Sequence, residues 1–488
     1  MKQDRQYQTT ARQWVNRQLN QGRHPLLVMP TGTGKTYTTV NIISDRISLG
    51  KRVIVLCHQM EIFNQWLADC TKHGLQPGYI NDEGVIGRNR NVYICMVQSL
   101  ENILVALPEK FVRSINEIIT DETHHSSAIT WRNIYSHFEN ALRFGLTATP
   151  YRADNQPLGE FYTHMYEAIK MSEAIKKGYL CKPIIIIPDE YKNNVPTIAE
   201  GIILKDQKQY IEQKKIIGDM LQTYKDIFNG LPVIIPCANH KHAEQVTEMF
   251  YNAGWSVDHI HSKMSDAERR AILRRMKKGE TNILITVAIG IEGMDIPGLY
   301  GIIWLRYTES LTIYMQFNGR AMRIMNGKKN FVMVDPVGNS VIHGRPDIDR
   351  KWSLDTEYVP GQDVADIGVE NRICPVCGVM NDSGNSKCWI CGYDFLTGLL
   401  NGEPVDKKKR RLPKFVDGDL VFLDEMEGER NGHIDTSNSN GNNNNNPNSD
   451  SDNQREILLT KLQKQEILNR DLTGIKLRSK FKEGIKWL

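Results

Sequence analysis

Short runs of β-branched and apolar residues recur along the first 345 residues and alternate with longer mixed segments. Five of them lie between residues 24 and 150: LLVMP, KRVIVLCH, NVYICMVQS, NEIITDE and RFGLTATP. Six more follow after residue 180: KPIIIIPDE, PVIIPCANH, SVDHIHS, NILITVAIG, GIIWLRYT and NFVMVDPVG. Strand-length runs separated by helix-length segments are typical of parallel sheets with crossover helices. The sequence therefore predicts an α/β fold class with two consecutive parallel-sheet domains of similar size.

The run pattern also predicts how the chain is divided. We expect the first domain at 1–152, the second at 153–345, a connector at 346–372, a cysteine-rich module at 373–394 and a tail at 395–488. The tail contains a basic run and an asparagine-rich tract at 438–454 that offers nothing apolar to offset its ordering entropy, so we expect the tract to be disordered. Leucines and isoleucines at partly helical spacing predict a short amphipathic helix near the end.

Composition restricts the class of protein only loosely. A net charge of +4 permits a nucleic-acid partner without arguing for one. The polar start has no apolar core of a secretory signal, and the longest apolar runs are too short to span a bilayer, so no membrane partner is expected. Five of the nine cysteines are scattered and four gather in one module, which indicates a reduced, cytoplasmic protein.

A glycine-containing loop follows the first apolar run, in LLVMPTGTGKTYTT. A strand, a loop and a helix start in this order form the setting of a phosphate-binding loop. Gly32 and Gly34 let backbone N–H groups surround phosphate oxygens, Lys35 can reach the β- and γ-phosphates of ATP, and the Thr36 hydroxyl can hold Mg²⁺. The strict motif has glycine where Met29 stands, and the alternative is a Gly-Thr loop with an exposed lysine.

Two acids and two histidines stand within five positions in IITDETHHSS, directly behind another apolar run. Asp121 closes that run, so it lies at the carboxyl end of a strand, where open α/β sheets bind ligands. There it can hold the Mg²⁺ of a bound nucleotide, while Glu122 orients the attacking water. Zinc on the histidines is the alternative, but His124 and His125 are adjacent and point apart on any regular element. No role is assigned to His125.

Together these motifs resemble those of superfamily 2 helicases and translocases of the D-E-x-H type. PTGTGKT, DETH, LTATP and QFNGRAMR stand in family order, VAIGIEGMDIP resembles motif V, and RQYQ resembles the adenine-reading glutamine motif. VLCHQMEIFNQW and VYICMVQSL resemble segments that grip the nucleic-acid strand. The resemblance spans residues 1 to about 345 and implies two tandem RecA-like domains that hydrolyse ATP with Mg²⁺ and act on nucleic acid.

The resemblance also implies a set of functional residues. Gln8 would read adenine, and His124 would relay hydrolysis to the TAT segment at 147–149. The nucleotide site would consist of Gln8, Pro30, Thr31, Gly32, Thr33, Gly34, Lys35, Thr36, Asp121, Gly293, Asp295 and Gln316. Catalysis would rest on Lys35, Asp121, Glu122, His124, Arg320 and Arg323.

Arg320 and Arg323 have a chemical reason to lie in the second domain. Phosphoryl transfer builds charge on the γ-phosphate oxygens, and a motor gains when a separate, movable domain supplies the compensating cation. The spacing predicts that both arginines lie on one helix face, and such an arginine is worth about 10³ to 10⁵ in rate. Two solvated surface arginines are the alternative, but the flanking Gln316 and Gly319 match the family motif.

A second metal is predicted by CPVCGVMNDSGNSKCWICG. Its two Cys-x-x-Cys knuckles, separated by ten residues, place Cys374, Cys377, Cys388 and Cys391 to form a closed tetrahedral Zn²⁺ site. Because no coordination position stays open, we interpret the zinc as structural, holding together a module too small for its own core. Four free thiols are the alternative.

The order of parts resembles RadD-type bacterial helicases and their phage relatives, over residues 1 to about 395. This resemblance implies unwinding of single-stranded or branched DNA in repair or recombination. Three alternatives stay open: a double-strand DNA translocase that does not separate strands, an RNA helicase, and a zinc-ribbon adaptor that binds a protein partner through the tail. Lys407–Arg411 could bind phosphate or, in a nucleated cell, serve as a nuclear localisation signal; in a bacterium we expect a nucleoid-associated protein.

Overall fold

The computed structural model describes residues 4–87, 89–123, 128–151, 156–187, 214–261, 263–287, 296, 298–325, 328–357, 371–405, 414–416 and 419–421. All of them belong to one unit, Met1–Glu427. Several sequence predictions lie outside the described residues: those on His124, His125, Gly293, Asp295, Lys407–Arg411, the asparagine-rich tract and the terminal helix.

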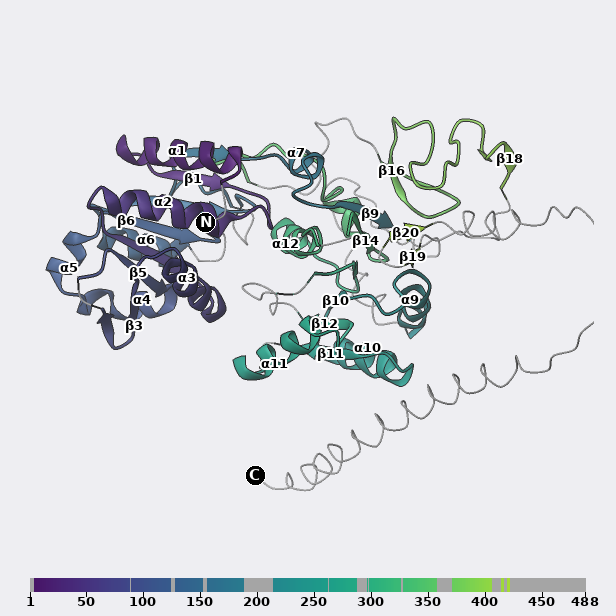
Figure 1. The fold of residues 1–488 in the computed structure, drawn as a ribbon, viewed down its shortest axis with the longest axis horizontal. Helices are drawn as coiled ribbons and strands as arrows, with labels where there is room; N and C mark the ends of the chain where they lie inside the picture. The colour runs from purple at the N-terminus through teal and green to yellow at the C-terminus, as the bar shows by residue number, and fades with distance from the viewer. Residues whose placement is uncertain are drawn as a thin grey trace, which may run out of the picture. The chain divides into compact units, whose positions relative to one another are not determined.

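The first sheet has eight strands in the order β4-β3-β5-β2-β6-β7-β1-β8, and its elements run from purple to blue in Figure 1. The strands are β1 (Pro25–Val28), β2 (Val53–Cys57), β3 (Gly78–Asn81), β4 (Gly84–Ile86), β5 (Val92–Met96), β6 (Glu117–Asp121), β7 (Leu142–Thr147) and β8 (His164–Glu167). Neighbouring strands are parallel except β3 and β4. The helices are α1 (Gln6–Asn20), α2 (Lys35–Ser48), α3 (Met60–Lys72), α4 (Val97–Ile103), α5 (Glu109–Ser114), α6 (Ala128–His137) and α7 (Met171–Lys176).

Alternating side chains of these strands fill two cores, one on each face of the first sheet. Leu27 of β1 packs with apolar residues of α1, α2 and α3, whereas its neighbours Leu26 and Val28 pack with residues of α4 and α6. Successive side chains of a strand point to opposite faces, so a continuous apolar run becomes a strand that helices cover on both sides. This is why the runs in the sequence are continuous rather than alternating.

The second sheet has six strands in the order β11-β12-β10-β13-β14-β9, and all its neighbours are parallel. The strands are β9 (Lys182–Ile186), β10 (Val233–Cys237), β11 (Val257–Ile260), β12 (Ile283–Val287), β13 (Gly301–Ile303) and β14 (Asn330–Val334). Its helices are α9 (Lys214–Ile227), α10 (His240–Asn252), α11 (Asp266–Lys277), α12 (Leu311–Ala321) and α13 (Asn339–Ile342), in teal and green in Figure 1. Side chains of Asn239, Ser265 and Ser310 accept hydrogen bonds at the starts of α10, α11 and α12.

All eleven predicted strands are present, but the first sheet contains three that the sequence analysis did not predict: β3, β4 and β8. Strand β8 pairs in parallel with β1, so the first sheet extends past residue 152, the predicted end of the first domain. The four residues of β8 are all half-buried and carry no β-branched side chain, which is why the run pattern gave no signal for them. We call everything up to α7 the first lobe and the sheet from β9 onward the second lobe.

The cysteine-rich module continues from the second lobe instead of standing apart from it. Its strands β15 (Asn371–Ile373) and β16 (Met380–Asp382) form a hairpin, and β17 (Leu399–Leu400) pairs with β18 (Glu403–Pro404). A third hairpin, β19 (Lys414–Val416) with β20 (Asp419–Val421), follows. Ile186 at the end of β9 forms an antiparallel bridge with Val379, and the two side chains belong to one apolar cluster. The ribbon and the second lobe therefore share a core.

The predicted connector returns to the first lobe. The Leu354 carbonyl accepts a hydrogen bond from the Gly159 N–H at 2.8 Å, and Trp352 Nε1 donates to Glu167 at 3.1 Å. Residues 346–357 thus tie the two lobes together in addition to the chain segment between β8 and β9. Within the described part of the chain, no helix has both the length and the apolar content to cross a membrane.

Candidate ATP site and cysteine cluster

The phosphate loop links the buried strand β1 to the start of α2 at Lys35. Gly32 and Gly34 have φ angles of 88° and 94°, in the left-handed region that favours glycine. A Cβ atom on Gly34 would lie 2.7 Å from Nε2 of Gln8, so a side chain at this position would also displace the Gln8 amide. The loop leaves the first N–H groups of α2 facing the cavity described below, which is an arrangement that binds phosphate.

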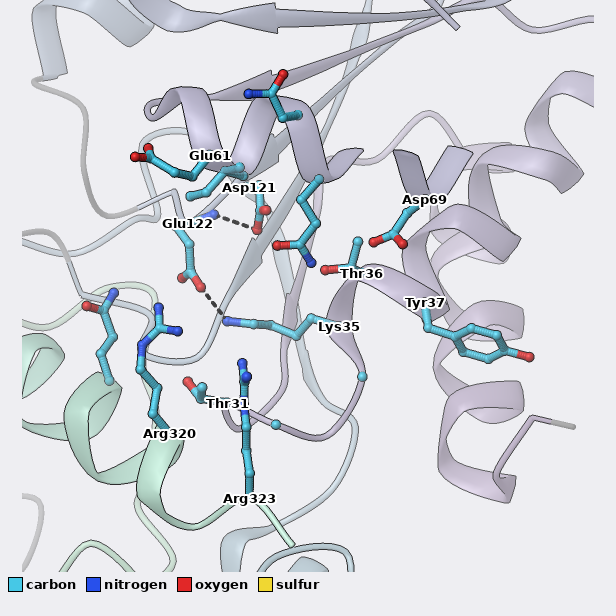
Figure 2. Close-up of a pocket in the computed structure, with 16 residues that line it drawn as sticks. Thr31, Lys35, Thr36, Tyr37, Glu61, Asp69, Asp121, Glu122, Arg320 and Arg323 are labelled. Carbon is cyan, nitrogen blue, oxygen red and sulfur yellow. Dashed lines mark hydrogen bonds and ion pairs between the residues drawn. The ribbon is translucent and has the colours of Figure 1, made fainter. Parts of the chain in front are cut away.

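An acidic pair follows the neighbouring strand β6. Asp121 is its last residue, and Glu122 stands in the left-handed region with a φ of 47°, which is strained for a non-glycine residue. Lys35 Nζ forms an ion pair with Glu122 Oε1 at 2.6 Å (Figure 2). Trp66 Nε1 donates to the other acid, Asp121 Oδ2, at 2.9 Å. The backbone N–H of Glu122 donates to the remaining oxygen, Asp121 Oδ1, at 3.0 Å, so each oxygen of the Asp121 carboxylate accepts a hydrogen bond.

Burial raises the pKa of Asp121, and the nearby negative charge of Glu122 raises it further. The Lys35 ammonium and the Trp66 hydrogen bond act in the opposite direction on the same pKa. A divalent cation would lower it as well, since it stabilises the ionised carboxylate. Oxygen ligands suit Mg²⁺, and the Thr36 hydroxyl lines the same cavity as Asp121, so these donors fit that ion.

A cavity of about 790 Å³ brings residues of both lobes together. It is lined by Thr31, Gly32, Gly34, Lys35, Thr36, Tyr37, Glu61, Ile62, Asn64, Gln65, Asp69, Asp121, Glu122, Gln316, Arg320 and Arg323. Figure 2 shows Arg320 and Arg323 reaching from the second lobe toward Lys35 and Glu122. A Cβ atom on Gly319 would lie 2.6 Å from Thr31, so the second lobe packs directly against the phosphate loop at this point.

The prediction that Arg320 and Arg323 share one helix face is wrong for the second arginine. Helix α12 ends at Ala321, and Arg323 forms an antiparallel bridge with Leu180 instead. Both guanidinium groups nevertheless line the cavity. The chain leaves the helix here because the backbone carbonyls of residues 321–323 accept hydrogen bonds from Lys328 and Cys181, which lie outside α12.

Four sulfur atoms gather in the ribbon within 4.8 Å of one another, from Cys374, Cys377, Cys388 and Cys391. The Sγ atoms of Cys374 and Cys391 are 3.6 Å apart, and so are those of Cys377 and Cys388. A disulfide would need about 2 Å. Sulfurs that bind one tetrahedral zinc ion at about 2.3 Å lie about 3.8 Å apart, so the donor set fits Zn²⁺.

Two family models match the chain. One, described as "Type III restriction enzyme, res subunit", matches residues 1–152, and another, described as "Helicase conserved C-terminal domain", matches residues 213–325. These matches cover the halves of the cavity that hold the phosphate loop and the arginine pair. The chain is a superfamily 2 helicase.

Three relatives share much of the chain, and two of them are named as helicases. The helicase is 27% identical over 413 residues to a 51.5 kDa protein of Lactococcus phage (isolate 7-9). The aligned region covers 82% of this chain and 83% of the phage protein. It is 26% identical over 367 residues to a Saccharomyces cerevisiae protein named as an ATP-dependent helicase, IRC3, with 69% and 52% covered. The ATP-dependent RNA helicase DBP3 of Lodderomyces elongisporus is 26% identical over 326 residues, with 62% and 57% covered. The chain thus spans about half the length of both yeast relatives.

Solved structures share the fold. A fragment of an HsdR subunit of a type I restriction enzyme from Vibrio vulnificus matches with a TM-score of 0.54 at 22% identity, over 68% of this chain and 64% of that one. The restriction-modification enzyme LlaBIII bound to DNA matches with a TM-score of 0.51 at 17% identity, over 69% of this chain and 28% of that one. The predicted fold class, two tandem RecA-like domains followed by a four-cysteine module, is confirmed.

Gln8 lies beside the phosphate loop but does not line the helicase cavity. Its Nε2 donates to the Thr33 carbonyl at 3.2 Å, and its Oε1 accepts from the Arg5 N–H at 2.9 Å. In this arrangement the amide supports the loop, and its role in reading adenine stays a prediction. Pro30 and Thr33 also lie outside the cavity lining, and the Thr33 hydroxyl donates to the Pro30 carbonyl at 2.6 Å.

Helix α3 also contributes to the site, and the motifs did not indicate this. Glu61, Gln65 and Asp69 of that helix line the cavity, and they recur every four residues, so they lie on one face. This spacing is visible in the sequence, but the segment was assigned only to gripping nucleic acid. Trp66 was missed because an apolar residue on an amphipathic helix is expected in the core, as indeed it is at 1% exposure.

The TAT segment contacts the helix that carries Arg320. The hydroxyls of Thr149 and Thr312 lie 3.0 Å apart, and Thr312 is in the first turn of α12. The Thr147 hydroxyl donates to the Thr149 carbonyl at 2.6 Å and fixes the turn. Since Thr123, one residue past the acidic pair, donates its N–H to the Leu146 carbonyl at 3.2 Å, a chain of contacts runs from the acids to α12.

Proposed function

We propose that the helicase uses ATP hydrolysis to move along DNA and separate its strands, in repair or recombination. The observation that carries this proposal is the cavity to which the first lobe contributes the phosphate loop and acids and the second lobe the arginines. Lobes that each supply part of one nucleotide site change their separation during hydrolysis, and a strand held by both lobes is then moved. The substrate we propose is single-stranded or branched DNA, supported by the resemblance of the motifs.

In the proposed reaction, each residue acts at a stated place. Mg²⁺, when bound through Asp121, supplies charge neutralisation at the β- and γ-phosphates. Lys35 exchanges its contact with Glu122 for a phosphate oxygen, and the carboxylate so released accepts a hydrogen bond from the attacking water. Arg320 and Arg323 stabilise the charge that develops on the γ-phosphate oxygens.

Zn²⁺ is the metal that we propose for the cysteine cluster, with a structural role. All four positions of a tetrahedral ion would be filled by thiolates, so the ion would have no place for a substrate. Its removal is one of the tests below.

The test is an ATPase assay over single-stranded, duplex, forked and four-way DNA and RNA, together with strand displacement on a fork. We expect stimulation by single-stranded and forked DNA and displacement that Lys35→Ala abolishes. Stimulation by RNA alone would contradict the DNA proposal, and the RNA helicase among the relatives makes this arm necessary.

A second candidate function is translocation on duplex DNA without strand separation. The match of residues 1–152 to a restriction-enzyme subunit favours it. If the helicase unwinds no fork but displaces a protein bound to duplex DNA, duplex translocation replaces strand separation as the proposed function. If Lys35→Ala abolishes turnover but leaves the cellular function intact, an adaptor role that binds proteins through the tail replaces both.

A further inference from the structure

The end of helix α12 positions the arginine pair. Arg320 is the penultimate residue of the helix, and Arg323 follows two residues after its end. The last carbonyls of any helix have no partner within it and must be bound by other groups. How the carbonyls around 321–323 are bound therefore decides where both guanidinium groups point.

Lys328 supplies the main contact to these carbonyls. Its Nζ donates to the carbonyl of Ala321 and, at 3.2 Å, to that of Arg323. The intervening carbonyl, on Met322, accepts from the Cys181 N–H at 2.8 Å. Three consecutive carbonyls between and beside the arginines are thus held by groups from outside the helix.

The environment of this lysine is unusual for a surface-type residue. Lys328 is only 5% exposed, and burial lowers its pKa. An ammonium near the end of a helix is favoured by the helix dipole, and its hydrogen bonds offset the cost of leaving water. Among the described groups, Cys181 is the titratable side chain that faces it.

We propose that Lys328 is a positioning residue for ATP hydrolysis, acting through the carbonyls of Ala321 and Arg323 to aim Arg320 and Arg323 at the γ-phosphate. Lys328 does not line the cavity, so it would act on ATP hydrolysis only through the two arginines. Geometry matters at this distance because a displacement of about 1 Å can cost about 10²-fold in rate.

The test compares Lys328→Met with Lys329→Met in steady-state ATP hydrolysis with saturating DNA. Lys329 is exposed, so its substitution makes the same charge change outside the core. We expect Lys328→Met to lower kcat about 10- to 100-fold with KM for ATP changed less than about 3-fold, since the arginines act mainly in the transition state. Lys329→Met should behave as the parent protein. An unchanged kcat in Lys328→Met overturns the proposal.

A double-variant cycle separates positioning from general stability. If Lys328 acts through the arginines, adding Lys328→Met to a variant that carries both Arg320→Ala and Arg323→Ala should lower kcat less than about 3-fold further. If the two losses multiply, the lysine acts independently and the proposal fails. Should Lys328→Met not fold, Lys328→Gln, which keeps an N–H donor, enters the same cycle, and thermal melting of each variant reports any loss of stability. An intermediate kcat for Lys328→Gln is expected.

Discussion

At the scale of single residues, the helicase site depends on buried groups that hydrogen-bond to the catalytic side chains and orient them. Trp66 is the clearest case: its indole N–H binds Asp121, yet its ring belongs to the core under α3. Residues that orient a metal ligand commonly change metal affinity by about 10- to 100-fold when they are removed. A residue can therefore be part of a site while appearing in the sequence only as a core position.

Trp66→Phe is expected to raise the Mg²⁺ concentration needed for half-maximal ATPase activity by about 10-fold, because Asp121 Oδ2 loses the indole N–H that orients it. The measurement is a Mg²⁺ titration at fixed ATP. Trp131→Phe is the matched control, since Trp131 is equally buried in the same lobe but packs against the other face of the sheet. An equal Mg²⁺ shift in both variants would show a general loss of packing instead.

His343 gives a pH dependence to stability. Burial lowers its pKa to about 4, and its Nε2 donates to the Thr308 carbonyl at 2.7 Å, so it is neutral in the folded protein. The unfolded chain takes up a proton below about pH 6.5 while the folded protein does so only near pH 4. Stability is therefore lost as the pH falls from about 6.5 to 4, by about 3 kcal/mol from this group.

In urea unfolding, His343→Phe should weaken the fall in the free energy of unfolding between pH 6.5 and 4. Phenylalanine keeps the stacking on Tyr314, at a ring distance of 5.1 Å, but cannot bind a proton. The variant is expected to be less stable at neutral pH, since the Thr308 carbonyl loses its donor. Parallel curves for the parent and the variant would contradict the assignment.

At the scale of elements, the contact between Thr149 and Thr312 is the described link from the TAT segment to α12. A buried neutral hydrogen bond contributes about 1 kcal/mol, so its loss changes a coupled equilibrium about 5-fold. Thr149→Val should reduce the base pairs opened per ATP by about that factor while ATP turnover changes less. Thr286→Val is the control, because the buried Thr286 hydroxyl has no hydrogen-bond partner among the described groups. Equal losses of turnover and unwinding would argue against a coupling role.

The elements were largely predictable from the sequence, and the exceptions have physical causes. Each continuous apolar run became a strand because helices cover both sheet faces. Strand β8 and the β3–β4 hairpin are half-buried or short, so they carry little periodic signal. The departure of the chain from α12 after Ala321 depends on Cys181, which is 140 residues from Ala321 in the chain, and local spacing contains no information about such a partner.

Some residues of the site could likewise be predicted from the sequence, whereas the positions of others depend on contacts that form only in the folded protein. The phosphate loop and the acids at the end of β6 follow from the sequence, because both are local and sit where parallel strands end. The position of the Gln8 side chain could not be predicted, because it depends on a hydrogen bond that its amide donates to the Thr33 carbonyl in the folded protein. The roles assigned to His124, Gly293 and Asp295 remain predictions.

At the scale of the whole molecule, the ribbon and the second lobe form one apolar cluster. Cys374, Cys377 and Cys388 are buried in it together with Ile184 and Val332. Cys374 follows directly after β15, and Arg345 forms an ion pair with Asp382 of β16 at 3.0 Å. Loss of the zinc ion that we propose for this cluster is therefore expected to destabilise the second lobe and, through it, the ATP site.

Chelation of Zn²⁺ should lower the melting temperature by at least about 10 °C and abolish ATPase activity, and added Zn²⁺ should restore both. Cys388→Ser should have a lowered melting temperature both with and without the chelator. The matched control is Cys237→Ser, a buried cysteine of the same cluster outside the ribbon, which should keep its sensitivity to chelator. If chelation leaves both the melting temperature and ATP turnover unchanged, the ribbon is independent of the motor.

Strand β9 is the outer strand of the second sheet, and the bridge from Ile186 to Val379 covers part of its open side. A free outer strand offers unpaired N–H and C=O groups to any other chain. Deleting the ribbon would therefore also uncover the Ile186 end of strand β9, so that its unpaired backbone groups could pair with a second copy of the protein. We expect a helicase shortened in this way to aggregate through this edge more readily than the full chain.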